Sequence, residues 1–214
     1  LPQIILRMTK KQRADFVRKE LDKLYPTVPI FLHHTDAYTL LVAVALSAQT
    51  TDKKVNEITP DLFRVAGTPQ AMARLEVSEI KDLIKEIGLS NTKAKNLKGM
   101  AEMLLRDYEG VVPQTFEELE KLPGVGHKTA SVVMSQWFGF PAFPVDTHIH
   151  RLMKLWKLTE GKNVIQTEAD AKKLFPQKDW NKLHLQIISY GREYSPARNW
   201  SLEKDFITRQ MFEK

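Results

Sequence analysis

Lys128 and Asp146 are the residues of this sequence whose types and surroundings favour nucleophilic chemistry. Lys128 lies in the segment Leu122-Pro123-Gly124-Val125-Gly126-His127-Lys128-Thr129-Ala130, at the predicted start of a helix. The helix dipole disfavours a cation there, and partial burial would penalise the ammonium form further. A neutral lysine amine is the form that attacks an electrophilic carbon to give an imine. The alternative is a surface lysine that contacts a phosphate.

The turn before Lys128 could itself bind a phosphate. Gly124 and Gly126 permit the positive φ angles of a tight turn and leave backbone N–H groups uncovered. These N–H groups lie at a helix N-terminus, which favours an anion. Val125 between the glycines can anchor the turn in the core. The alternative is an ordinary turn between helices that needs glycine only for its geometry.

Chain length permits Asp146 to return to the neighbourhood of Lys128. The helix predicted over 127–138 advances about 18 Å. The segment 139–145 contains two prolines and can span up to about 25 Å when extended. Asp146 is also a preferred residue type for capping the helix that follows it, and its second oxygen could face a substrate.

Helical periodicity dominates the sequence, and no alternating strand pattern stands out. Helices are expected over about 10–24, 38–48, 52 to near 60 or 63, 78–87 with Gly88 closing it, 91–108, 116–122 and 127–138, and from about 146, 167 and 179 onward. Short connections between about ten helices predict an all-α protein. Composition places no domain boundary.

Composition narrows the class of protein. The net charge is +6 among 214 residues, which favours an anionic partner without identifying it. The absence of cysteine excludes disulfides, thiolate metal sites and a cysteine nucleophile. The apolar run 40–46 is far shorter than the ~20 residues of a membrane span, and no secretory signal is recognisable. We expect a cytoplasmic, nucleoid-associated protein if the source is bacterial, and a nuclear or organellar one if it is eukaryotic.

Four segments resemble one family. The segment 122–130 resembles the helix-hairpin-helix motif of DNA-binding proteins and, with Lys128, its version in endonuclease III-type DNA glycosylases. The segment Pro144-Val145-Asp146-Thr147-His148-Ile149-His150-Arg151 is similar to the loop that holds the essential aspartate of that superfamily. The segments 46–52 and 87–94 resemble its lesion-side loop and second loop. Matching segments run from about Asp36 to Arg198.

The resemblance implies an all-α, two-lobed helix-hairpin-helix DNA glycosylase fold with a central substrate cleft. Residues 30–140 would form a six-helix barrel-like domain with the hairpin at about 115–138. Residues 1–29 and 141–214 would form a second helical domain. The implied partner is double-stranded DNA with a damaged base or abasic site, bound by a monomer.

The implied activity is that of a base-excision-repair DNA glycosylase with AP lyase activity on an oxidised pyrimidine. Once the nucleotide is flipped out, Lys128 would attack C1′ and the imine would allow β-elimination. Asp146 would accept a proton from Lys128 or stabilise positive charge on the sugar. The implied DNA-contacting residues are Gln49, Leu89, Gly124, Val125, Gly126, His127, Thr129 and His148.

Several of these residues have alternative roles. Gln49 and Leu89 would fill the gap left by the flipped nucleotide. Alternatively, Gln49 could be an ordinary polar loop residue and Leu89 a core contact. His148 could orient the site or be a structural histidine. A monovalent cation could be held by hairpin carbonyls.

The sequence departs from the family near its C-terminus. Endonuclease III proteins usually carry four cysteines there that bind a [4Fe–4S] cluster. An ungapped comparison after Gly191-Arg192-Glu193-Tyr194 places Ser195, Leu202, Asp205 and Met211 at those positions. We therefore expect no iron–sulfur cluster and no other cofactor. Apolar packing is expected to hold the segment instead.

Two rival functions remain. One is a mismatch or other-base glycosylase on the same fold, because the lesion pocket is the part least defined by the sequence. The other is a non-catalytic DNA-binding module that uses the hairpin only as a clamp. The presence of both Lys128 and Asp146 argues against the second rival, since binding alone requires neither.

Overall fold

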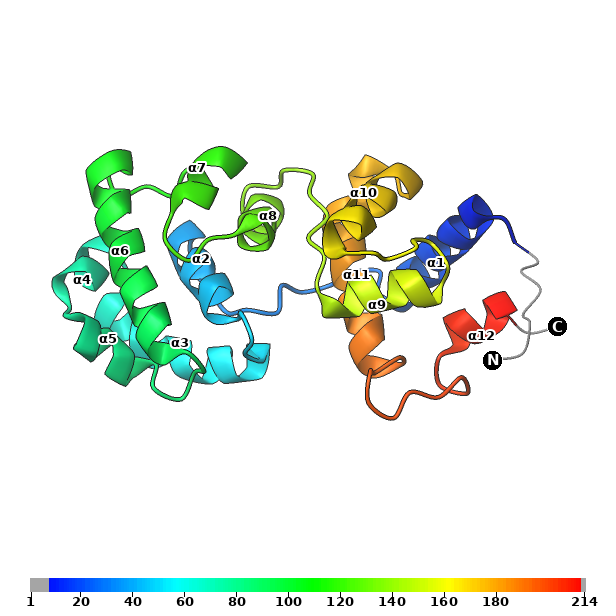
Figure 1. Ribbon diagram of the computed structural model, residues 1–214, viewed down its shortest axis with the longest axis horizontal. Helices are drawn as coiled ribbons and strands as arrows, with labels where there is room; N and C mark the ends of the chain where they lie inside the picture. Colours follow the sequence, from blue (N-terminus) through cyan, green and yellow to red (C-terminus); the bar gives the residue numbers. More distant parts are fainter. Residues whose placement is uncertain (1–7, 213–214) are drawn as a thin grey trace. The chain divides into compact units, whose positions relative to one another are not determined.

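The computed structural model describes residues 8–212, and every regular element in this range is a helix (Figure 1). The all-α prediction is confirmed. The elements are α1 (Lys10–Leu24), α2 (Ala37–Leu46), α3 (Asp52–Ala66), α4 (Pro69–Arg74), α5 (Val77–Leu83), α6 (Ser90–Tyr108), α7 (Phe116–Lys121), α8 (His127–Gln136), α9 (Thr147–Leu155), α10 (Val164–Leu174), η1 (Gln177–Asp179), α11 (Trp180–Glu193) and α12 (Phe206–Phe212). None of the described helices has the length and apolarity needed to cross a membrane.

The described chain forms two compact units. The hairpin unit is Ile30–Phe140 and contains α2 to α8. The terminal unit combines the described residues up to Pro29 with those from Pro141 onward, and contains α1 and α9 to α12. Lys128 belongs to the hairpin unit and Asp146 to the terminal unit.

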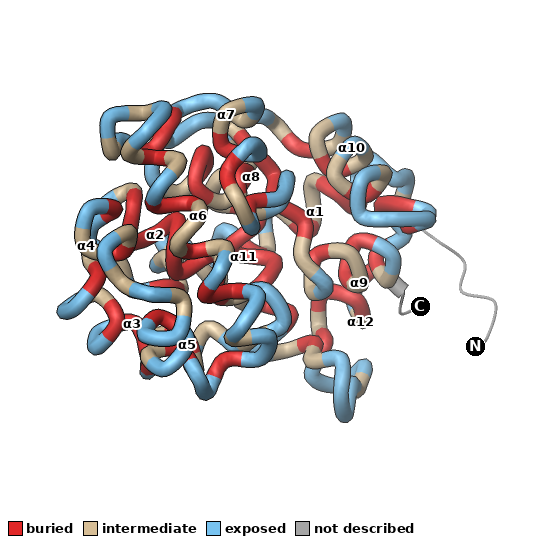
Figure 2. The backbone as a smooth tube through the Cα atoms, turned by 60° about the vertical axis from the view of Figure 1, so that its left-hand side comes forward, coloured by how far each residue is buried: buried red, intermediate tan, exposed pale blue. Residues whose placement is uncertain are grey.

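The hairpin unit is organised around α2. Its sequence AYTLLVAVAL is apolar on nearly every side, and a helix of that kind is stable only when it is surrounded. It packs against α3, α6 and α8, while α6 packs along α4 and α5. Buried residues, red in Figure 2, alternate along the other helices with exposed ones. The unit therefore has one core, which includes Val125 of the hairpin.

Polar caps define several helix starts, among them the one that the sequence predicted at Asp146. Thr9 caps α1 in a reciprocal capping box with Gln12, and Thr115 accepts a hydrogen bond from the N–H of Glu118 at the start of α7. Asp146 caps α9. Each side chain satisfies an N–H group that has no partner within its helix.

Three helix predictions were wrong. The third helix continues through Pro60 to Ala66, because Leu62 and Ala66 lie on its buried face and their packing outweighs the cost of the proline. The helix predicted to end at Ile87 ends at Leu83. The short helix α4, which begins with Pro69 after the cap Thr68, was not expected.

Packing of the C-terminal segment differs from the expected apolar contacts. Ile207 and Met211 are buried, but Leu202 is 39% exposed. The fully buried carboxylate of Asp205 accepts hydrogen bonds from Tyr190 Oη at 2.7 Å and Trp200 Nε1 at 2.8 Å. It also accepts one from the N–H of Thr208 at 3.1 Å. Because a buried carboxylate must be hydrogen-bonded, these donors make it an anchor for the segment.

Ser195 lies beside the same anchor. Its carbonyl and hydroxyl oxygens accept hydrogen bonds from the guanidinium of Arg151 on α9. The charge of Arg151 also interacts with Asp205, while burial lowers the pKa of the guanidinium. The aromatic rings of Tyr190, Tyr194 and Phe206 pack on one another nearby. Polar contacts, with aromatic packing nearby, therefore hold Ser195 and Asp205, two of the four positions that the ungapped comparison aligned with cysteines.

Replacing Asp205 with alanine is expected to lower the free energy of unfolding by about 3 kcal/mol, because two buried donors and one partly buried donor lose their acceptor. The measurement is urea unfolding followed by tryptophan fluorescence, to which Trp200 contributes directly. Glu203→Ala is the control, since Glu203 is exposed in the same segment. Equal stability of the two variants would contradict the role of Asp205 as an anchor.

Candidate active site

The hairpin between α7 and α8 is built around the buried side chain of Val125, which lies between two exposed glycines. Val125 is 6% exposed and belongs to the core, which confirms it as the anchor of the turn. Gly124 has φ +76°, and a Cβ there would lie 2.9 Å from the side-chain nitrogen of Asn96. Gly126 has φ −97° and open space where a Cβ would lie, so the expected positive φ was wrong at this position.

The start of α8 presents backbone N–H groups without a side-chain cap. Gly126 is the N-cap residue and has no side chain to accept hydrogen bonds from the first turn. Such N–H groups, together with the helix dipole, favour an anionic ligand. The geometry therefore suits a phosphate at this end of α8.

Lys128 is exposed in the first turn of α8. The partial burial considered for it is not observed, because the residues of the hairpin unit leave its side chain exposed. Any desolvation of the amine must therefore come from a bound substrate. Thr129, next in the same turn, is partly buried.

His127 is held by its neighbours in the hairpin. Its Nδ1 lies 2.9 Å from Oε1 of Glu120, and its ring stacks on Phe116 with the centroids 5.9 Å apart. The carboxylate of Glu120 offsets any positive charge on the imidazole. His127 is therefore less suited to add charge to a phosphate site than the sequence suggested.

Asp146 has the dual geometry that the sequence allowed. Oδ1 accepts a hydrogen bond from the N–H of Ile149 at 2.8 Å, which leaves Oδ2 for a second interaction. The side chain is partly buried. The charge of the Arg151 guanidinium interacts with it. Burial lowers the pKa of His184 to about 4 and so keeps that imidazole neutral near pH 7.

His148 packs closely against α11. A Cβ at Gly191 would lie 3.2 Å from both Cβ and Nδ1 of His148, so a larger residue there would require a small shift of its neighbours. Its contact with α11 accounts for a histidine at this position in structural terms. The proximity of Lys128 and Asp146 stays a prediction, because they belong to different units.

Gln49 and Leu89 share an unusual backbone geometry. Gln49 has φ 57° and Leu89 has φ 61°, in the left-handed region that non-glycine residues seldom adopt. Both are exposed, Leu89 by 61%. Leu89 is the N-cap residue of α6. Gly88, which was expected to close the preceding helix, does not have a positive φ. An exposed leucine in a costly conformation fits a ligand contact better than the alternative of a core contact.

Lys93 is a residue of this region whose role the sequence analysis missed. It lies on α6 in the same buried stripe as Leu97 and Met100, yet its Nζ donates three hydrogen bonds to the segment 46–50. The signal in the sequence was a lysine on the apolar face of an amphipathic helix.

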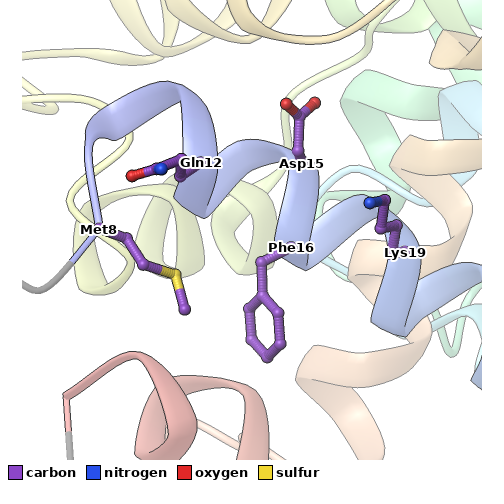
Figure 3. Close-up of a pocket in the computed structure, with 5 residues that line it drawn as sticks. All are labelled: Met8, Gln12, Asp15, Phe16 and Lys19. Carbon is purple, nitrogen blue, oxygen red and sulfur yellow. The ribbon is translucent and has the colours of Figure 1, made fainter.

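A separate hollow lies on α1 in the terminal unit and contains none of the candidate residues (Figure 3). Met8 and Phe16 point to one side of the helix, and Asp15 points to the other. Gln12 is engaged in the capping box with Thr9. The polar groups do not converge, so the hollow does not compete with the hairpin as a candidate site.

Comparison with known proteins agrees with this geometry. Residues 42–177 match the HhH-GPD superfamily of base excision DNA repair proteins. The chain belongs to this superfamily. Endonuclease III of Synechocystis sp. is 42% identical over 191 residues, which are 89% of this chain and 87% of the relative. That similarity places the chain in the endonuclease III family.

Solved structures show the same relationship. A trapped covalent intermediate of an endonuclease III with DNA, an estranged-adenine complex, matches with a TM-score of 0.88 and 37% identity over 92% of each chain. A thermostable thymine-DNA glycosylase matches with a TM-score of 0.78 and 26% identity over 94% of each chain. The fold is therefore the all-α glycosylase fold that the resemblance implied.

The residues near the C-terminus do not fit the iron–sulfur cluster of typical family members. The sequence contains no cysteine, and Asp205 and Ser195 already serve as hydrogen-bond acceptors within the fold. No group of three or more potential metal-ligating side chains converges anywhere in residues 8–212.

Proposed function

We propose that this protein is a base-excision-repair DNA glycosylase with AP lyase activity that acts on oxidised pyrimidines in double-stranded DNA. The observation that carries the proposal is the exposed Lys128 in the first turn of α8, directly after an uncapped glycine hairpin. This placement puts a primary amine beside a phosphate-binding helix start, within a chain of the endonuclease III family.

The chemistry follows from two groups. The neutral amine of Lys128 bonds to C1′ of the flipped nucleotide, the glycosidic bond breaks, and the base leaves with the electron pair. Asp146 accepts the proton that the amine loses, or stabilises positive charge on the sugar. The C1′–O4′ bond of the sugar then breaks, O4′ takes up a proton, and C1′ and the lysine nitrogen form an imine. The imine acidifies the C2′ proton, and removal of that proton expels the 3′ phosphate by β-elimination.

DNA is gripped and opened by separate parts of the hairpin unit. The N–H groups around Gly126 bind a phosphate irrespective of base sequence. Gln49 faces the orphaned base, and Leu89 enters the base stack beside it. The left-handed backbone at both residues supports this assignment because costly conformations persist mainly where function requires them.

One assay tests this function. Wild-type protein is incubated with duplexes that carry thymine glycol, an abasic site or a T:G mismatch, and borohydride is added. We expect covalent adducts with thymine glycol and with the abasic site. Base release from the mismatch without strand cleavage would favour the rival that the match to a thymine-DNA glycosylase suggests. Salt-sensitive binding without an adduct on any duplex would favour a DNA-binding module.

The proposed enzyme works without an iron–sulfur cluster or any other bound cofactor. Asp205, which stands at one of the positions aligned with the cluster cysteines, supports this. Its carboxylate already accepts hydrogen bonds from Tyr190, Trp200 and Thr208. Iron analysis of the purified protein is the test, and four irons per chain would overturn the proposal. A monovalent cation on the hairpin carbonyls remains a secondary proposal.

A further inference from the structure

Lys93 is a buried lysine on α6 whose ammonium group binds the loop that carries Gln49. Its side chain is 8% exposed, and Nζ donates to the carbonyls of Leu46 at 2.9 Å and Ala48 at 2.6 Å. It also donates to Oγ1 of Thr50 at 3.1 Å. The three N–H bonds of an ammonium group are thus matched by three acceptors. All three are uncharged oxygens, so burial is only partly compensated and lowers the pKa of Lys93.

The three acceptors lie on both sides of Gln49 in the sequence, and the backbone of Lys93 is hydrogen-bonded to Leu89. The N–H of Lys93 donates to the carbonyl of Leu89 at 2.9 Å. One residue therefore joins the two segments whose exposed residues adopt left-handed conformations. Without these bonds, nothing in the local sequence favours φ 57° at a glutamine.

We propose that Lys93 is a positioning residue that holds Gln49 in its DNA-inserting geometry and fixes it relative to Leu89. The proposal rests on the proposed function, in which these two residues fill the gap left by the flipped nucleotide. A left-handed conformation at a non-glycine residue persists only when its surroundings hold it, and the ammonium supplies three bonds that do so. A loop ordered in advance loses less conformational freedom when DNA binds.

Lys98 provides a matched control on the same helix. Its Nζ donates to the carbonyls of Ala73 at 2.9 Å and Leu75 at 2.7 Å, so it also holds a neighbouring segment by backbone oxygens. That segment is the end of α4, which contains no candidate DNA-contacting residue. Lys98 Nζ also lies 3.5 Å from Oε1 of Glu102. Lys98→Met therefore removes an ammonium group that binds backbone carbonyls without loosening the loop of Gln49.

The test compares Lys93→Met with Lys98→Met on a thymine glycol duplex. We expect Lys93→Met to slow single-turnover base release about tenfold, since small misplacements have large effects on rate. Lys98→Met is expected to change that rate by less than about twofold. A 2-aminopurine opposite the lesion should gain less fluorescence on binding Lys93→Met than on binding wild type, because an ordered Gln49 no longer holds the orphaned base.

A double-mutant cycle decides whether Lys93 acts through Gln49. In a Gln49→Ala background, Lys93→Met should add little to the loss. Fully multiplicative losses, or an equal loss in Lys98→Met, would overturn the proposal. If Lys93→Met fails to fold, Thr50→Val replaces it, because this variant removes only one of the three acceptors. We expect Thr50→Val to slow base release about threefold, and to have no further effect in a Gln49→Ala background. Wild-type protein that released no base would instead count against the proposed function itself.

Discussion

Replacing Lys128 with glutamine is expected to abolish the borohydride-trapped adduct and to slow strand cleavage by about 10³-fold or more. A glutamine amide cannot form an imine with C1′, so both readouts depend on the amine itself. Lys128 is exposed, and its replacement should leave the free energy of unfolding within about 0.5 kcal/mol of wild type. The measurements are gel-resolved adduct formation and single-turnover cleavage of an abasic duplex.

Lys121→Gln is the matched control for the loss of charge. Lys121 is 56% exposed on α7, the other helix of the hairpin, and pairs with Glu117 at 3.1 Å. Both variants lose one positive charge near the bound phosphate and should weaken DNA binding by a similar small factor. Only Lys128→Gln should lose the adduct. An adduct that survives in Lys128→Gln would identify another nucleophile.

Replacing Asp146 with asparagine is expected to slow base release by about 10²- to 10⁴-fold while leaving α9 intact. Asparagine caps a helix about as well as aspartate, so the bond to the N–H of Ile149 can be kept. What is lost is the negative charge that can accept a proton or stabilise the sugar. The measurements are single-turnover base release from a thymine glycol duplex and urea unfolding.

Asp36→Asn separates catalysis from capping. Asp36 caps α2 through the same type of bond, in which Oδ1 accepts from the N–H of Thr39 at 2.7 Å, and it is not a candidate site residue. We expect it to retain nearly wild-type activity. If Asp146→Asn kept base release within about fivefold of wild type and remained folded, the assignment of Asp146 as a catalytic residue would be wrong.

The helices could be predicted where a local signal fixes their ends. Thr9, Thr115 and Asp146 each satisfy N–H groups within three residues, so neighbouring sequence suffices to locate them. Whether α3 stops near Pro60 or continues to Ala66 could not be decided from the sequence, because it depends on which partners bury Leu62. Local propensity and tertiary packing disagree there, and packing wins.

The candidate site divides in the same way. Val125 between two glycines identifies itself as an anchor from sequence alone, and the fold buries it. The roles of Lys93 and Asp205 depend on acceptors and donors that lie far away along the chain, so residue type and spacing do not reveal them. The exposure of Lys128 could not be decided from the sequence, because burial depends on the whole unit.

The hydrogen bonds of Asp205 have a consequence for how this protein is made. They form from groups that the polypeptide itself supplies, so the C-terminal segment can reach its folded state without delivery of iron or sulfide. Thiolate clusters are vulnerable to the oxidants that also damage DNA bases, because cysteine sulfur is readily oxidised. We therefore expect this enzyme to remain folded and active in iron-starved or peroxide-stressed cells, when the demand for repair of oxidised bases is greatest.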